Sequence, residues 1–137
     1  MNARTDTLID ILPTGTFPLE FAISVSKNLL FVVCQEDNNP VYPLFKGSVY
    51  VFDLNTRQLV RKIYERFYQP HGIAVDDKNG LLYISSRNVD ADGPAPHHVS
   101  SCEGRNGFYH IIDLNTWQTI RRSAEISVDP YSIAAKP

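Results

Sequence analysis

The residues best suited to chemistry gather in one polar stretch, PAPHHVSSCEGRNG, at positions 94–107. It contains His97, His98 and Cys102, whose imidazole nitrogens and thiolate sulfur are ligands that zinc and copper accept. Adjacent side chains of an extended chain point to opposite sides, so both histidines could bind one ion only from a turn. His71, earlier in the chain, could add a fourth ligand. The stretch therefore allows a zinc or copper site, without the paired C-x-x-C spacing of a strong metal motif.

Two other interpretations of this stretch stay open. Cys34 and Cys102 could form a disulfide, which needs Cα atoms about 4.4–6.8 Å apart and typically stabilises a fold by about 2–4 kcal/mol. Such a bond would suit an oxidising compartment. Alternatively, the stretch is a polar loop that faces solvent or a partner, because its glycines and prolines favour turns. Loops of this length are usually functional or disordered.

The composition is that of one globular domain and argues against several classes of partner. The chain has 137 residues, 43% of them hydrophobic and 20% charged, which is ordinary for a globular protein. A net charge of −2 argues against nucleic acid, whose phosphates need clustered Lys and Arg. No apolar run approaches the roughly 18 residues of a membrane-spanning helix. No signal peptide is predicted in this chain, and the absence of C-x-x-C-H argues against covalent haem.

The chain contains two copies of one unit. The segment FPLEFAISVSKNLLFVVC (17–34) aligns with QPHGIAVDDKNGLLYISS (69–86), which begins 52 residues later. GSVYVFDLNTRQLVRKI (47–63) aligns with GFYHIIDLNTWQTIRRS (107–123), which begins 60 residues later. A further copy of the opening, DPYSIAAKP, follows at 129–137. Internal copies of this kind indicate stacked supersecondary units.

Each unit predicts four short antiparallel strands, and no segment has a convincing helical period. In the second copy, the expected strands are 72–75, 81–85, 108–113 and 117–126. Asn79-Gly80 is a hairpin signal between the first two strands, and the unbroken apolar run of the second strand suits burial on both faces. Four strands in each unit of about 40–60 residues is the pattern of a β-propeller blade.

The repeated residues resemble a known family of propellers. Pro18, Pro70 and Pro130 each open a unit in the form P-x-x-[IF]-A, and V-Y-V-F-D-L-N-T or Y-H-I-I-D-L-N-T follows after an apolar strand. This pattern resembles the YVTN/YncE-like, WD40-like repeat of surface-layer, lactonase-like and amine-dehydrogenase-like propellers. The resemblance covers residues 6–137 and implies a bacterial or archaeal protein of the periplasm or cell exterior. Such propellers usually have about seven blades, more than this chain contains.

The copies account for only part of such a ring. We expect two complete blades, at 16–67 and 68–127, preceded by the last strand of another blade at 6–15 and followed by a first strand at 128–137. Bare blade faces and strand edges favour aggregation. The sequence therefore predicts that the remaining blades of a longer propeller, or other copies of this chain, complete the ring.

The two copies differ in length between their second and third strands, where 35–46 and 87–106 form inserts. In a propeller this connection emerges at the same end as the connections between blades. The blade openings at that end carry Glu20, His71 and Tyr131, which are the candidate ligand-binding residues near the central channel. His71 is the best single candidate, and a hydrogen-bonded structural histidine is the alternative.

Other polar and aromatic residues have plainer interpretations. The recurring DLNT element (53–56 and 113–116) predicts a structural turn, and His110 and Trp117 are expected to pack within or at the edge of the sheets. There is no nucleophile motif, phosphate-binding glycine loop or spaced carboxylate pair. The leading hypothesis is a binding or scaffolding module that presents loops to a ligand or protein partner. The alternative is part of a lactonase-like or dehydrogenase-like enzyme with its site at the channel face.

Overall fold

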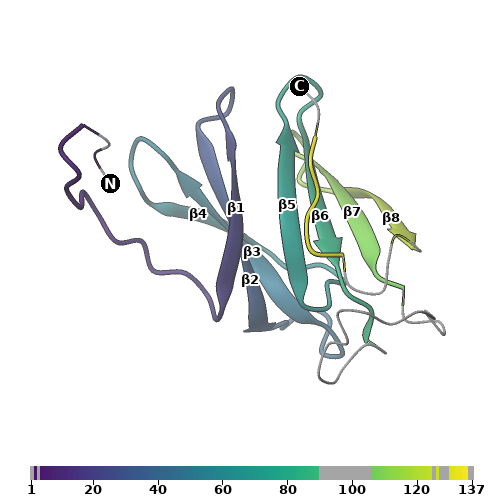
Figure 1. Cartoon of the computed structure of the whole chain (residues 1–137). Coiled ribbons are helices and arrows are strands. Elements are labelled where there is room, and N and C mark those ends of the chain that lie inside the picture. Colours follow the sequence, from purple (N-terminus) through teal and green to yellow (C-terminus); the bar gives the residue numbers. More distant parts are fainter. Residues whose placement is uncertain (1, 3, 90–105, 125, 127–129, 136–137) are drawn as a thin grey trace.

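The chain folds as β-structure. The computed structural model describes residues 2, 4–89, 106–124, 126 and 130–135, with the backbone alone for 123–124. Within this part of the chain, eight strands form two four-stranded antiparallel sheets, ordered β1-β2-β3-β4 and β5-β6-β7-β8, and no α-helix is present (Figure 1). The predicted all-β fold class, with two four-stranded units, is confirmed.

The strands follow the two copies of the sequence unit. The first sheet contains β1 (Pro18–Ser24), β2 (Leu29–Asn38), β3 (Lys46–Asp53) and β4 (Leu59–Ile63). The second sheet contains β5 (Pro70–Asp76), β6 (Leu81–Ser86), β7 (Phe108–Asp113) and β8 (Thr119–Ala124). Consecutive strands pair as hairpins in both sheets. Where the strands of the two copies align, each residue of β1 or β2 is therefore structurally equivalent to the residue 52 positions later, in β5 or β6. Each residue of β3 or β4 is likewise equivalent to the residue 60 positions later, in β7 or β8.

The DLNT elements form the turn between the third and fourth strands of each sheet. Asp53 Oδ1 accepts hydrogen bonds from the backbone N–H groups of Asn55 (2.9 Å) and Thr56 (2.8 Å). Asp113 Oδ1 accepts the equivalent bonds at 2.7 and 3.0 Å. The bond from Thr56, or from Thr116, contributes most to lowering the pKa of the aspartate in each turn. The repeated carboxylates therefore fix a chain reversal, as predicted.

The hydrophobic core lies between the two sheets. Leu29, Phe31 and Val33 of β2 point toward the second sheet, because alternate residues of a strand face one side. The other buried members of this core are Val49, Val51, Ile63, Phe67, Ile73, Leu82, Ile84, Ile112 and Leu114. Neither sheet buries this face alone, so the contact between the units holds the fold together.

A glycine and a proline meet where the second unit begins. A Cβ atom on Gly47 would lie 2.2 Å from the Pro70 ring, and Gly47 has a φ of 103°, which favours glycine. The same contact recurs 60 residues on, where a Cβ on Gly107 would lie 2.6 Å from the Pro130 ring. The close approach of backbone and ring therefore recurs at each successive opening of the repeat.

At the opposite end of the sheets, a carboxylate links the two units. Asp77 accepts hydrogen bonds from the Ser24 hydroxyl and from the backbone N–H groups of Val25 (2.7 Å) and Ser26 (3.2 Å). These donors, Ser24 first, lower the pKa of the Asp77 carboxyl. We call this end, which also holds both DLNT turns, the turn end.

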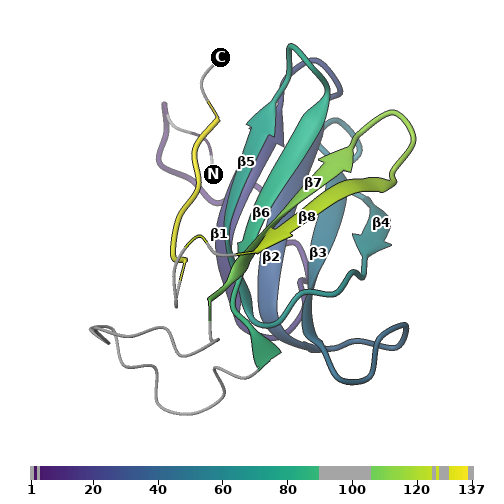
Figure 2. The ribbon, with the colours of Figure 1, turned by 90° about the vertical axis from the view of Figure 1, so that its right-hand side faces the viewer.

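Residues 130–135 lie beside β5, much as β5 lies beside β1 (Figure 2). They pair in neither sheet, and neither do residues 8–15. These segments cover most of the two outer strands predicted at 6–15 and 128–137. A strand needs a hydrogen-bonded neighbour, and no strand among the described residues pairs with either segment. The blade assignments of these ends therefore remain predictions.

The first insert is shorter than the sequence comparison predicted. β2 continues through Asn38 and β3 begins at Lys46, so residues 35–38 belong to a strand and the loop is 39–45. Asn39 organises this loop, because its side-chain oxygen accepts hydrogen bonds from the N–H groups of Val41 and Tyr42 at 3.0 and 2.9 Å. Its amide nitrogen donates to the Glu65 carbonyl at 2.7 Å.

Candidate functional site

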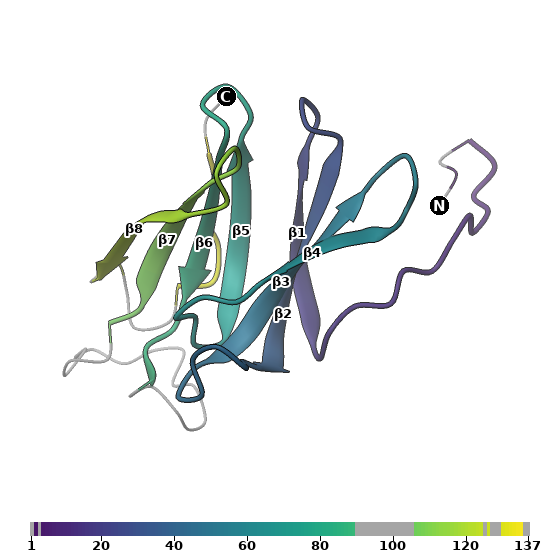
Figure 3. The same cartoon turned by 180° about the vertical axis from the view of Figure 1, so that it is seen from behind.

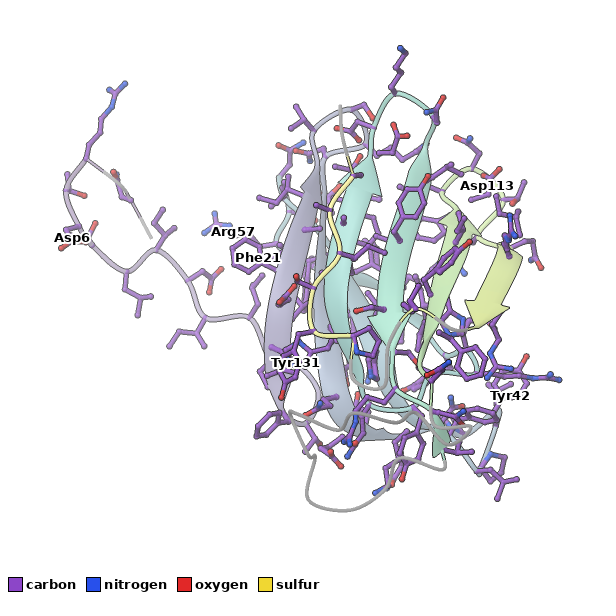
Figure 4. The ribbon with its side chains drawn as sticks, turned by 45° about the vertical axis from the view of Figure 1, so that its right-hand side comes forward. Asp6, Phe21, Tyr42, Arg57, Asp113 and Tyr131 are labelled. Carbon is purple, nitrogen blue, oxygen red and sulfur yellow. The ribbon has the colours of Figure 1, made fainter. Side chains whose placement is uncertain are left out.

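The blade openings and the first insert meet at one end of the molecule, which we call the loop end. It holds the starts of β1 and β5 and the loop 39–45, opposite the turn end (Figure 3). Tyr131 and Tyr42 both lie toward this end, whereas Asp113 lies at the other (Figure 4). A backbone hydrogen bond of 3.1 Å from Gln69 to Lys46 ties the insert to the second opening. The openings and the first insert therefore lie at the same end of the two sheets.

The three candidate ligand-binding residues lie together at the loop end. The rings of His71 and Tyr131 have centroids 4.3 Å apart at an angle of 59°. His71 Nδ1 lies 3.8 Å from Glu20 Oε1. Each residue comes from a different opening, so the packing of successive openings brings them into contact. We call this group the opening cluster.

The opening cluster combines a buried nitrogen with an accessible carboxylate. The His71 side chain is 15% exposed and that of Glu20 is 39% exposed. His71 Nδ1 is buried and has no hydrogen-bond partner among the described residues. The pair with Glu20 is an ion pair only when the imidazole is protonated. The cluster can therefore offer the Glu20 carboxylate to a polar ligand, beside the tilted rings of His71 and Tyr131.

A second polar group, which the sequence did not reveal, joins the two inserts. Gln69 Nε2 donates to Glu36 Oε1 at 2.7 Å, and the Arg87 guanidinium donates to the Gln69 side-chain oxygen. Lys46 lies 3.9 Å from the other Glu36 oxygen. Gln69 has a φ of 48°, an uncommon conformation for a residue that is not glycine. The repeat pattern gave no signal for this group, because its members come from the two inserts, which are not repeated, and from Gln69 before β5.

A buried carboxylate supports the start of the first unit. Asp37 accepts hydrogen bonds at 2.6 Å from both the Thr16 backbone N–H and the Ser48 hydroxyl. A Cβ on Gly15 would lie 2.2 Å from a carboxylate oxygen of Asp37, so a side chain at this position would force the carboxylate to move. Cys34, nearby, is buried and has no disulfide partner among the described residues, and burial is the main cause that raises the pKa of its thiol. A protonated, buried thiol is a poor nucleophile.

The metal and disulfide hypotheses concern residues that the structure does not describe. His97, His98 and Cys102 lie outside the described residues, so the proposed zinc or copper site and the Cys34–Cys102 disulfide both remain predictions. The described part of the chain contains no group of three or more His, Cys, Asp or Glu residues placed to hold a metal ion. The base of the second insert is closed by a 3.2 Å hydrogen bond from the Asn88 side chain to the Asn106 carbonyl.

His110 and Trp117 have packing roles, as predicted. His110 is 1% exposed, and its ring packs edge-on against Phe67 with centroids 4.8 Å apart. Burial, assisted by the nearby Arg122, lowers the pKa of His110 to about 3. Trp117 lies near the Phe31 ring and beneath the Arg61 guanidinium, 4.7 Å from its centroid. A neutral, enclosed imidazole of this kind does not exchange protons with a ligand near neutral pH.

The chain was also compared with known proteins. No family model matches it, and no curated protein matches it significantly. The described residues include no helix long and apolar enough to cross a bilayer. Fold class therefore rests on the two four-stranded sheets, and the resemblance to YVTN/YncE-like propellers rests on the repeated residues alone.

Proposed function

We propose that this chain is a binding or scaffolding β-propeller module whose loop end recognises a ligand or a protein partner through polar contacts. The observation that carries the proposal is the opening cluster. Three successive openings of a repeated frame bring Glu20, His71 and Tyr131 within contact distance. Binding residues often lie on connecting segments that a rigid scaffold positions.

The contrast between frame and cluster supports this role. Pro70 and Pro130 make equivalent contacts with glycine, so the frame around the openings is constant. The residues that directly follow these prolines, His71 and Tyr131, differ in chemical type. His71 Nδ1 is a buried ring nitrogen without a hydrogen bond among the described residues, and such a group costs about 1–3 kcal/mol. The Glu20 carboxylate, on a side chain that is 39% exposed, is the group of the cluster that a hydrogen-bond donor on a ligand can reach.

The location of the protein belongs to the same proposal. The resemblance to exported propellers implies the periplasm or the cell exterior. A Cys34–Cys102 disulfide, which would suit such a compartment, is the feature that checks it. Mass measurement with and without reductant decides whether the two thiols pair.

Nuclear magnetic resonance provides the direct test of binding. The labelled chain is titrated with mixtures of small amines, carboxylic acids and sugars, and the backbone amide shifts near Gly72 are followed. We expect at least one compound to shift these amides, with about tenfold weaker binding in His71→Ala. Lys78→Ala, at the exposed turn end, is the matched control and should bind like the wild type. Absence of any shift, or equal binding in His71→Ala, would refute the proposed site.

One observation favours the enzymatic alternative, a lactonase-like or dehydrogenase-like site. His71 and Glu20 form an imidazole–carboxylate pair, which is an arrangement used for general acid–base catalysis. Hydrolysis of a simple lactone that is lost in His71→Ala would support it. So would stoichiometric zinc or copper that disappears when His97 and His98 are both replaced by alanine. Neither result is expected of a pure binding module.

A further inference from the structure

Among the described residues, no other sheet covers the outer face of the second sheet. We use "outer face" for the side chains of Tyr83, Tyr109 and Ile111, which point away from the first sheet and are half-buried. Residues 130–135 run beside β5, along one edge of this face (Figure 2). The remainder borders two cavities of about 380 and 460 Å³, which Tyr109 and Ile133 both line.

The equivalent face of the first sheet is fully covered. Phe31, Val49 and Val51 occupy the positions of Tyr83, Tyr109 and Ile111, and all three are 0% exposed. Two elements of the second sheet cover them, because Ile73 of β5 and Leu82 and Ile84 of β6 belong to the same core. A complete contact between units therefore needs both a first and a second strand.

Residues 130–135 occupy the position of the first of these strands. Pro130 contacts Gly107 as Pro70 contacts Gly47. The Ser85 hydroxyl donates to the Pro130 carbonyl at 2.8 Å and accepts from the Gly72 N–H at 2.9 Å. A Cβ on Gly72 would lie 2.7 Å from the backbone of residues 132–133, so this segment packs closely on β5. The segment therefore shares its proline–glycine contact with β5 and packs closely on β5, but no strand of the described residues pairs with 132–135.

The element that the outer face lacks is a second strand. In the second sheet, β6 pairs antiparallel with β5, with Leu82 opposite Val75 and Ile84 opposite Ile73. Both leucine and isoleucine are 0% exposed and fill the core between the sheets. The two cavities lie between residues 130–135 and the outer face, where an equivalent strand would place its apolar side chains.

We propose that residues 130–135 form the innermost strand of a third blade, and that their edge and the outer face accept a strand of the repeat type L-L-[FY]-[VI]. The occupant is thus an extended, alternating apolar strand of the kind found in β2 and β6, added antiparallel to 132–135 by strand augmentation. The proposal does not depend on the loop end, so binding of a polar ligand there is a separate question.

The probe is a synthetic peptide of residues 79–86, NGLLYISS, with a fluorophore at its N-terminus. Its binding to the full chain is measured by fluorescence anisotropy. The matched control peptide carries Leu82→Ser and Ile84→Ser, which keeps the backbone donors and removes the apolar side chains. We expect saturable binding of the first peptide and about tenfold weaker binding of the second.

Two protein variants locate the binding. Ile111→Asp places a charge on the outer face and should weaken peptide binding about tenfold or more. Ala134→Pro removes an edge N–H from the segment and should weaken it without changing the face. Ile120→Asp on β8, which replaces a residue that is already exposed, should bind like the wild type. Equal binding of both peptides, loss in Ile120→Asp, or no saturable binding would overturn the proposal.

Discussion

Equivalent side chains of the two sheets are buried to very different extents. Phe21 of β1 is 66% exposed, whereas Ile73, its counterpart in β5, is 5% exposed. Leu30 is half-buried and its counterpart Leu82 is fully buried. Phe21 points away from the second sheet (Figure 4), and Ile73 points toward the first. The comparison shows that burial in a stacked repeat depends on the neighbouring unit and not on the residue type alone.

The largest expected difference comes from truncating these equivalent leucines. Leu82→Ala should lower the free energy of unfolding by about 2–5 kcal/mol, because it leaves a cavity between the sheets. Leu30→Ala should cost about 1 kcal/mol, because its side chain already contacts solvent. Urea unfolding of both variants measures the two losses under identical conditions. Equal losses would mean that the first sheet is covered in solution and would contradict the comparison.

The equivalent residues Tyr50 and His110 should differ in their effect on stability at low pH, because of the two only the histidine makes the free energy of unfolding depend on pH in this range. The pKa of His110 lies at about 3 in the folded chain, below its usual value near 6.5. The unfolded chain therefore binds a proton more readily, and stability falls as the pH drops from about 6.5 toward 3. Between pH 7 and pH 4.5 the expected loss is about 3 kcal/mol.

His110→Leu tests this effect. The variant should remove most of that loss, and it should be at least as stable as the wild type at pH 7, because two unpaired ring nitrogens disappear. Tyr50→Phe is the control, since a phenol does not titrate in this range. An unchanged dependence on pH in His110→Leu would show that other groups cause it.

A smaller difference in stability is expected when two glycines with positive φ are each replaced by alanine. Gly47→Ala should cost about 1–3 kcal/mol, because its Cβ would overlap the Pro70 ring at the joint between the sheets. Gly80→Ala should cost about 1 kcal/mol, since its φ of 67° is strained but the nearest atom, on Asn115, is 3.3 Å away. Thermal unfolding compares the two. A larger loss in Gly80→Ala would mean that the joint can adjust.

Much of the fold could be predicted from the sequence. Alignment of the two copies predicted all eight strands, because alternating apolar residues and the DLNT turns are local signals that repeat. The end of β2 was missed, since residues 35–38 are polar and resemble a loop. They remain in the sheet because Asp37 is held by Thr16 and Ser48, and that contact is not visible in a local pattern.

Only those residues of the candidate site that lie at the openings of the repeated units could be predicted from the sequence. Glu20, His71 and Tyr131 follow from their positions at successive openings. The group around Gln69 could not be predicted, because its contacts with Glu36 and Arg87 depend on how two inserts pack. Side-chain contacts between non-repeated segments leave no periodic signal in a single sequence.

The contact between Gly47 and Pro70 has a geometric consequence. It leaves no room for even one extra carbon atom, so it limits how closely the second unit can rotate toward the first. When identical steps follow each other head to tail, this angle alone decides whether the series closes into a circle or winds into an open spiral. An added methyl group at this joint would therefore change the angle between the two units, and in any longer series of such units the change would accumulate at every step.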